Sequence, residues 1–119
     1  MTDVRSLTVT DDLQSYAVAH GSYPVDAVLR DLRQETLRLG GPAGMQVGPD
    51  EGQLLTFLAR MVGARKAVEV GTFTGYSSLC IARALPADGK LICCDISDEW
   101  TRIGRRAWQR AGVADRIDL

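Results

Sequence analysis

The stretch that decides the fold covers residues 66–78 and reads KAVEVGTFTGYSS. It opens with the apolar residues Ala67, Val68 and Val70, a short run typical of a strand that is buried on both faces in a parallel sheet. Residues 76–85 then follow the apolar spacing of a helix, and glycines separate the two segments. The stretch therefore predicts a strand, a glycine turn and a helix.

The glycine turn has the form Gly71-x-x-x-Gly75. Glycines let the backbone approach a ligand closely, and the following helix offers free N–H groups and a positive dipole end to polar or anionic atoms. A dinucleotide fingerprint requires a glycine at the middle position, where this chain has Phe73. The acid at the strand end, Glu69, suits a cationic ligand better than a diphosphate. The turn thus indicates a nucleoside site without a pyrophosphate.

A second acid marks the same site. Residues 90–95 predict the next strand, which ends in Asp95, about 20 residues beyond the second glycine, where Rossmann-like units place a ribose-binding acid. A right-handed crossover would bring Glu69, Gly71 and Asp95 to one crevice. Since an adenosine ligand with an amino group and a sulfonium fits both acids, we expect S-adenosylmethionine. Structural alternatives stay open, because Asp95 could cap the next helix and Glu69 could bond to the glycine turn.

Helices are expected before this core. Thr10 is a candidate N-cap for the first, which Gly21 would end. Pro24 suits the first position of the second helix, which ends at Gly-Gly-Pro over residues 40–42. Residues 44–48 then predict an irregular loop.

Further helices flank the two strands. One is expected to begin at Pro49 and to face the core through a run of apolar side chains: Leu54, Leu55, Leu58, Met61 and Val62. Ser97 is the expected N-cap of another helix, which ends at Gly112. Residues 116–119 read as the start of a third strand.

Composition excludes several classes of function. The formal net charge is −1, with Lys+Arg 14 against Asp+Glu 15, so no overall field favours nucleic acid, and no apolar run suggests a membrane span. The arginines between residues 102 and 110 read as a solvated, partly paired helix face. Cys80, Cys93 and Cys94 lack the spacing of a zinc site or a disulfide framework, which favours reduced thiols and a cytoplasmic location.

Three segments together resemble a known family. They read GMQVGPDEGQ over residues 44–53, EVGTFTGYSS over residues 69–78, and Cys94-Asp95. In this order they closely resemble the cation-dependent O-methyltransferases of the caffeoyl-CoA and catechol type. The resemblance implies an α/β, Rossmann-like S-adenosylmethionine methyltransferase fold, truncated here after the start of the third strand.

The resemblance also implies a domain plan and a reaction. Residues 1–119 would form a single domain, with N-terminal helices and a cofactor-covering loop in residues 1–48 and the first part of the core in residues 49–119. The reaction would move a methyl group from S-adenosylmethionine to a hydroxyl of a catechol-like or other small phenolic substrate, assisted by a divalent metal such as Mg²⁺. We also expect a homodimer.

By the same resemblance, a set of residues is expected to bind the cofactor: Met45, Val47, Glu69, Gly71, Thr72, Ser77 and Asp95. No catalytic residue and no metal ligand is assigned to this chain, because the matching family segments lie beyond residue 119. Two alternatives remain. One is a non-catalytic S-adenosylmethionine-binding or interaction module, and the other is a nucleotide-dependent oxidoreductase.

Overall fold

The computed structural model describes residues 8–119. Along the chain the elements are α1 (Asp11–Ala19), α2 (Ala27–Leu37), the 3₁₀ helix η1 (Gly41–Met45), α3 (Pro49–Met61), β1 (Lys66–Val70), α4 (Tyr76–Ala84), β2 (Lys90–Cys94), α5 (Asp98–Arg110), the 3₁₀ helix η2 (Ala114–Arg116) and β3 (Ile117–Asp118). Among these residues, no helix combines the length and the apolar character needed to span a membrane.

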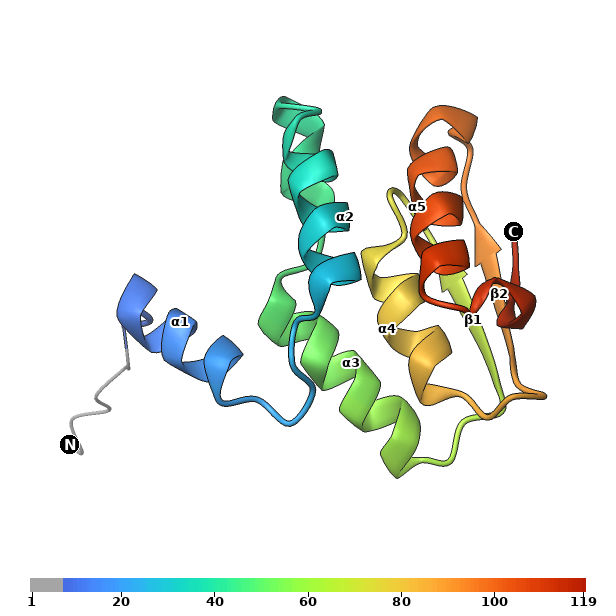
Figure 1. Cartoon of the computed structure of the whole chain (residues 1–119), viewed down its shortest axis with the longest axis horizontal. Coiled ribbons are helices and arrows are strands. Elements are labelled where there is room, and N and C mark those ends of the chain that lie inside the picture. Colours follow the sequence, from blue (N-terminus) through green and yellow to red (C-terminus); the bar gives the residue numbers. More distant parts are fainter. Residues whose placement is uncertain (1–7) are drawn as a thin grey trace, which may run out of the picture.

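The strands form a parallel sheet of order β1-β2-β3. Val68 pairs with Ile92 and Val70 with Cys94, so β1 and β2 end at the same edge. Helix α4 connects β1 to β2 and α5 leads towards β3, which makes successive β-α-β units. Figure 1 shows α4 and α5 beside the strands and α1 at the far end of the molecule. The predicted α/β, Rossmann-like architecture with N-terminal helices is confirmed.

Helices cover only one face of this sheet in the described part of the chain. Leu91 and Cys93 point to that face and are buried, whereas Val68 and Val70 point to the other face and are 67% and 85% exposed. The expectation that β1 is buried on both faces is therefore wrong for residues 8–119. Successive side chains of β1 point alternately to the face of the sheet that the helices cover and to the face that they leave exposed, as in any β-strand.

Polar side chains begin three of the helices. Thr10 Oγ1 accepts the N–H of Leu13 at 3.3 Å and caps α1, and Ser97 Oγ accepts the N–H of Trp100 at 3.3 Å and caps α5, both as predicted. The second helix was expected to begin at Pro24, which is wrong. Asp26 caps α2 instead, because its carboxylate accepts the N–H of Leu29 at 3.0 Å.

Helix α3 begins at Pro49 as predicted, but its apolar side chains do not lie in the core. Gly52 and Thr56 are its buried residues, and they face α4, where Thr56 Oγ1 donates to the Cys80 carbonyl at 3.2 Å. The expected core residues are exposed or only partly buried. A glycine and a threonine at this contact let the two helices approach closely, which periodicity of apolar residues alone could not reveal.

The arginines of α5 are partly paired, as the sequence indicated. Arg110 lies 2.7 Å from Asp31 and Arg106 contacts Glu35, both acids being on α2. These exposed pairs hold α2 beside α5, although exposed pairs contribute at most about 1 kcal/mol each.

Candidate cofactor site

The glycine turn lies at the carboxyl end of β1. Gly71 and Gly75 have φ values of 90° and 77°, and Phe73 between them has φ of 52°. This left-handed backbone is ordinary for glycine and rare for a phenylalanine, so other contacts must hold it. The turn also bonds to the neighbouring strand, since Gly71 N donates to the Cys94 carbonyl at 2.8 Å.

Asp95 supplies the contact that holds Phe73. One carboxylate oxygen accepts the N–H of Phe73 at 2.7 Å and the other accepts the N–H of Ser97 at 2.9 Å. Desolvation raises the pKa of Asp95, but backbone donors led by Phe73 and Ser97 outweigh it and hold the pKa below its usual value. Asp95 is therefore a carboxylate that ties the glycine turn to the start of α5. Each oxygen keeps a lone pair for a further donor.

Glu69 is held by the first turn of α4. Its Oε1 accepts the hydroxyl of Ser77 at 2.6 Å, and its Oε2 accepts the hydroxyl of Ser78. The thiol of Cys93 lies 3.6 Å from the same Oε2. The carboxylate at the end of β1 therefore bonds to hydroxyls in the first turn of α4. The bond to the glycine turn that was the structural alternative is not among the hydrogen bonds of the described residues, and the role in binding a cofactor stays a prediction.

Residues 45–47, just before α3, lie over the turn and are called the cover below. The predicted irregular loop is in part the 3₁₀ helix η1, which ends at Met45. Gln46 Nε2 then donates to Thr36 Oγ1 at 2.8 Å and to Thr74 Oγ1 at 3.1 Å. Thr36 in turn donates to Thr74 at 2.8 Å. This network, which joins α2, the cover and the glycine turn, was not predicted, since three polar residues far apart in sequence carry no shared spacing.

The cover and the turn enclose a small crevice of about 50 Å³. Of the predicted cofactor residues it is lined by Met45, Val47, Gly71, Thr72 and Ser77. Thr72 is buried as a whole residue. Glu69 and Asp95 do not line the crevice but lie directly behind its wall, bonded to Ser77 and Phe73. The crevice can admit a small polar end of a ligand, and a nucleoside would have to extend along the sheet edge towards Asp95.

The aromatic residues of the turn pack into the structure. Phe73 meets Trp100 edge to face with ring centroids 5.0 Å apart, and Tyr76 is buried. Trp108 Nε1 donates to the Gly75 carbonyl at 3.0 Å. These contacts hold the turn against α5, and residues 71–77 of the turn and α4 line the crevice.

The fold and the crevice define the class of protein to which this chain belongs. It has a parallel β-α-β unit whose glycine turn and strand-end acids suit a nucleoside ligand. A family model described as O-methyltransferase matches residues 19–119, so the chain belongs to the O-methyltransferase family.

Curated relatives agree. The chain is 41% identical over 118 residues to "Probable caffeoyl-CoA O-methyltransferase" of Arabidopsis thaliana, a match that covers 98% of this chain and 50% of the relative. It is 38% identical to caffeoyl-CoA O-methyltransferase 1 of Zea mays, covering 97% of this chain and 45% of the relative. The chain thus spans about half the length of these relatives.

Solved structures share the fold. The O-methyltransferase TomG of Streptomyces achromogenes, solved in complex with S-adenosylmethionine, matches with a TM-score of 0.78 and 31% identity over 88% of this chain and 46% of TomG. The O-methyltransferase of Bacillus cereus, solved with S-adenosylhomocysteine, matches with a TM-score of 0.81 and 30% identity over 90% of this chain and 48% of that protein.

Proposed function

We propose that this chain forms the cofactor-binding part of an S-adenosylmethionine-dependent O-methyltransferase that acts on a hydroxyl of a small phenolic or catechol-like molecule. The observation that carries the proposal is Asp95, an ionised carboxylate at the end of β2 that also fixes the glycine turn. Family membership and the ligands of TomG and the Bacillus cereus enzyme support the cofactor.

Each residue expected to bind the cofactor has a task in this proposal, whether it lines the crevice or lies behind its wall. Asp95 would accept hydrogen bonds from the ribose hydroxyls, since its oxygens keep free lone pairs. Glu69 would attract the cationic end of the cofactor, and Ser77 would meet its carboxylate at the start of α4, where free amides assist. Gly71 and Thr72 would offer backbone, and Met45 and Val47 would cover the methionine part. The cofactor supplies the methyl group when bound.

The remaining features of the proposal depend on the resemblance. Among residues 8–119, no group of three or more His, Cys, Asp or Glu side chains is placed to hold a metal ion. A divalent metal such as Mg²⁺ therefore stays in the proposal without a ligand assigned from residues 8–119, and no step is assigned to it. Assembly as a homodimer, a cytoplasmic location and a single domain over residues 1–119 are proposed on the same basis.

A second candidate is a module that binds the cofactor without catalysis. The observation that favours it lies within residues 8–119, where no group of three or more His, Cys, Asp or Glu side chains is placed to hold a metal ion. Methyl transfer to a catechol by the verified 119-residue species with added Mg²⁺ would exclude this candidate. Cofactor binding with no transfer would favour it.

Titration with S-adenosylmethionine, S-adenosylhomocysteine and NAD tests the proposal. We expect the two adenosyl ligands to bind and NAD to fail, since Phe73 occupies the place of the middle glycine that a dinucleotide needs. Asp95→Ala should weaken S-adenosylmethionine by roughly 10-fold to 150-fold, the scale of hydrogen bonds to a charged group. The matched control is Asp98→Ala, an exposed acid at the start of α5. An unchanged Kd in a folded Asp95→Ala protein would contradict the assignment.

A further inference from the structure

Helix α5 packs against the glycine turn outside the cofactor crevice. Gly104 and Trp108 are four residues apart, so they share one face of this helix. Both are buried, and neither is among the residues that line the crevice. Any influence of these two residues on a ligand in the crevice must therefore pass through the turn.

Trp108 contacts the last residue of the turn. Its Nε1 donates to the Gly75 carbonyl at 3.0 Å, and the residue is 1% exposed. A Cβ at Gly75 would lie 2.6 Å from the Trp108 ring, so the ring and the backbone of the turn are in direct contact. The indole therefore fixes the direction of the Gly75 carbonyl.

Gly104 allows this close approach of α5. A Cβ at Gly104 would lie 3.0 Å from the Thr74 carbonyl oxygen and 3.0 Å from the Trp108 ring. Both distances are shorter than the optimum of about 3.5–4.0 Å between non-bonded atoms, so one of these neighbours would have to move. The absence of a side chain at position 104 thus sets the distance between α5 and the turn.

The Gly75 carbonyl belongs to the peptide group that leads into α4. Because a trans peptide group is planar, its C=O and N–H point in opposite directions, and fixing the Gly75 carbonyl also fixes the N–H of Tyr76. That N–H has no acceptor within residues 8–119, as is usual in the first turn of a helix. Gly75, Tyr76 and Ser77 all line the cofactor crevice. The bond from Trp108 therefore bears on how α4 presents its free N–H groups to the crevice.

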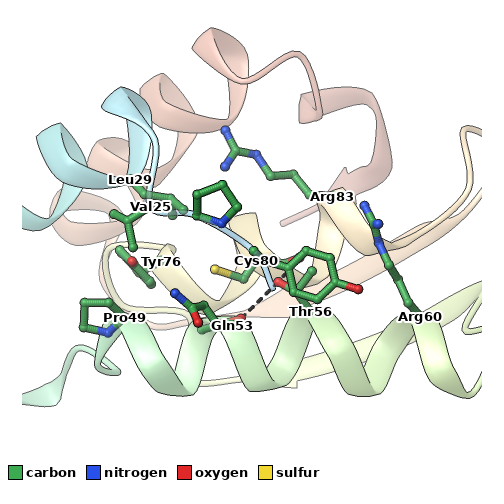
Figure 2. Close-up of a pocket in the computed structure, with 12 residues that line it drawn as sticks. Val25, Leu29, Pro49, Gln53, Thr56, Arg60, Tyr76, Cys80 and Arg83 are labelled. Atoms are coloured by element: carbon green, nitrogen blue, oxygen red, sulfur yellow. Dashed lines mark hydrogen bonds between the residues drawn. The ribbon is translucent and has the colours of Figure 1, made fainter. Parts of the chain in front are cut away.

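The side chain of Tyr76 holds the other end of the same peptide group. Tyr76 is 2% exposed, and a Cβ at Gly52 on α3 would approach its Cε1 to 2.8 Å. Figure 2 shows Tyr76 among the residues that line a hollow beside α3 and α4, which include Val25, Leu29 and Pro49. The peptide group between the turn and α4 is thus held from α5 at its carbonyl and from α3 through the Tyr76 ring.

From these contacts we propose that Trp108 and Gly104 are positioning residues for the amino-acid end of the cofactor. They hold the peptide group between Gly75 and Tyr76 so that the free N–H groups at the start of α4 face the cofactor's carboxylate, the kind of group that a helix N-terminus favours. The inference rests on the proposed function, because it places S-adenosylmethionine in the crevice. The nucleoside, which Asp95 serves in that proposal, does not depend on this contact.

Two ligands separate a positioning role from a merely structural one. S-adenosylhomocysteine carries the amino-acid end, and methylthioadenosine has the same nucleoside without it. Trp108→Phe keeps an aromatic ring and removes the donor to Gly75. In calorimetric titrations of this variant, S-adenosylhomocysteine should bind about tenfold more weakly, the scale of one hydrogen bond to a charged group, and methylthioadenosine should lose less than about twofold.

Gly104→Ala tests the same contact without changing the indole. The added methyl group must displace the Thr74 carbonyl or the Trp108 ring, so S-adenosylhomocysteine should bind about fivefold more weakly and methylthioadenosine should lose less than about twofold. Alanine favours a helix more than glycine does, which offsets the effect of the contact on stability. The matched control is Gly41→Ala, at a glycine without positive φ and with nothing within 4 Å of an added Cβ, and it should alter neither Kd.

The indole N–H signal of Trp108 provides a test on the unaltered chain. A carboxylate that accepts the N–H of Tyr76 polarises that peptide group and strengthens the bond from the indole to its carbonyl. S-adenosylhomocysteine should therefore shift the signal in a nitrogen–proton NMR spectrum, and methylthioadenosine should not. Equal losses for both ligands in the folded variants, or an indole signal that S-adenosylhomocysteine leaves in place, would overturn the inference. Failure of both ligands to bind the unaltered chain would overturn the proposed function, and the inference with it.

Discussion

Ser77 donates its hydroxyl to Glu69 across 2.6 Å, so two residues expected to contact the same cofactor are bonded to each other. Ser78 donates to the second oxygen of Glu69. The carboxylate is thereby fixed before any ligand arrives, which lowers the entropy cost of binding.

Glu69→Gln should weaken S-adenosylmethionine more than S-adenosylhomocysteine, since a carboxylate attracts the sulfonium cation and an amide does not. Parallel calorimetric titrations of the two ligands measure the difference. Ser78→Ala is the control, because it removes a donor to Glu69 and keeps the charge. Equal losses for both ligands in the Glu69→Gln protein would leave Glu69 with a structural role only.

Asp95 should also make stability depend on pH. Its pKa is depressed in the folded chain, so its contribution is complete above the unfolded value of about 3.9 and disappears as the pH falls through the lower folded value. Urea unfolding should therefore show a gap between wild type and Asp95→Asn at pH 7 that narrows in acid below pH 4. A gap that stays constant down to pH 2 would contradict this account.

Gly75 and Gly112 offer a matched pair of substitutions. Both have positive φ, 77° and 68°, but a Cβ at Gly75 would lie 2.6 Å from the Trp108 ring, whereas nothing lies within 4 Å at Gly112. Gly112→Ala should cost about 1 kcal/mol from the backbone alone. Gly75→Ala should cost about 3 kcal/mol or more, because strain adds to overpacking against a buried ring. Urea unfolding measures the free energy of unfolding of both variants. Similar losses of stability would show that the Trp108 ring moves aside to accommodate the added methyl group.

Gln46→Ala should lower the free energy of unfolding by about 1–3 kcal/mol, since it takes a donor from the buried hydroxyls of Thr36 and Thr74. The same change should weaken S-adenosylmethionine, because Met45 and Val47 lose their anchor on either side. Gln109→Ala on the exposed side of α5 is the control. If the Gln46→Ala protein had the stability and the cofactor affinity of the wild type, the cover would not depend on the hydrogen bonds of Gln46.

The three cysteines should differ in reactivity. Burial raises the pKa of Cys80 and of Cys93 to about 11, whereas Cys94 is exposed. At pH 8 the two buried thiols are almost fully protonated, so iodoacetamide should modify Cys94 first. Mass spectrometry of timed samples follows the order. Rapid labelling of Cys80 would show that α3 and α4 separate.

Local signals in the sequence were enough to place most elements. The caps at Thr10 and Ser97, the glycine turn and the positions of the two strands were confirmed because each depends on neighbours in the chain, whereas the expected burial of β1 on both faces was wrong. The start of α2 was predicted wrongly at Pro24. Pro24 and Asp26 are both typical of a helix N-terminus, and the structure shows that Asp26 is the N-cap. The crossover of a β-α-β unit predicted that Glu69, Gly71 and Asp95 share one crevice; Gly71 lines it, whereas Glu69 and Asp95 lie behind its wall.

Features that depend on distant contacts could not be predicted. The bonds of Gln46 to Thr36 and Thr74 join three separate segments. The close approach of α3 and α4 at Gly52 reversed the expected core face of α3, because small residues replaced large apolar ones at the contact. The bond between Ser77 and Glu69 required the three-dimensional path of the turn.

Strand β1 is an edge strand in the order β1-β2-β3, and the glycine turn follows directly from it. Within residues 8–119, no strand pairs with the other side of β1, so a ligand at Gly71 meets only the β2 side and the cover around Met45 and Val47. Association rate constants vary little between related complexes. A half-enclosed ligand therefore differs from a fully enclosed one mainly in its dissociation rate. For this chain the cofactor should exchange rapidly, with one averaged NMR signal for free and bound forms, and any surface that closes the β1 side would lengthen its residence time.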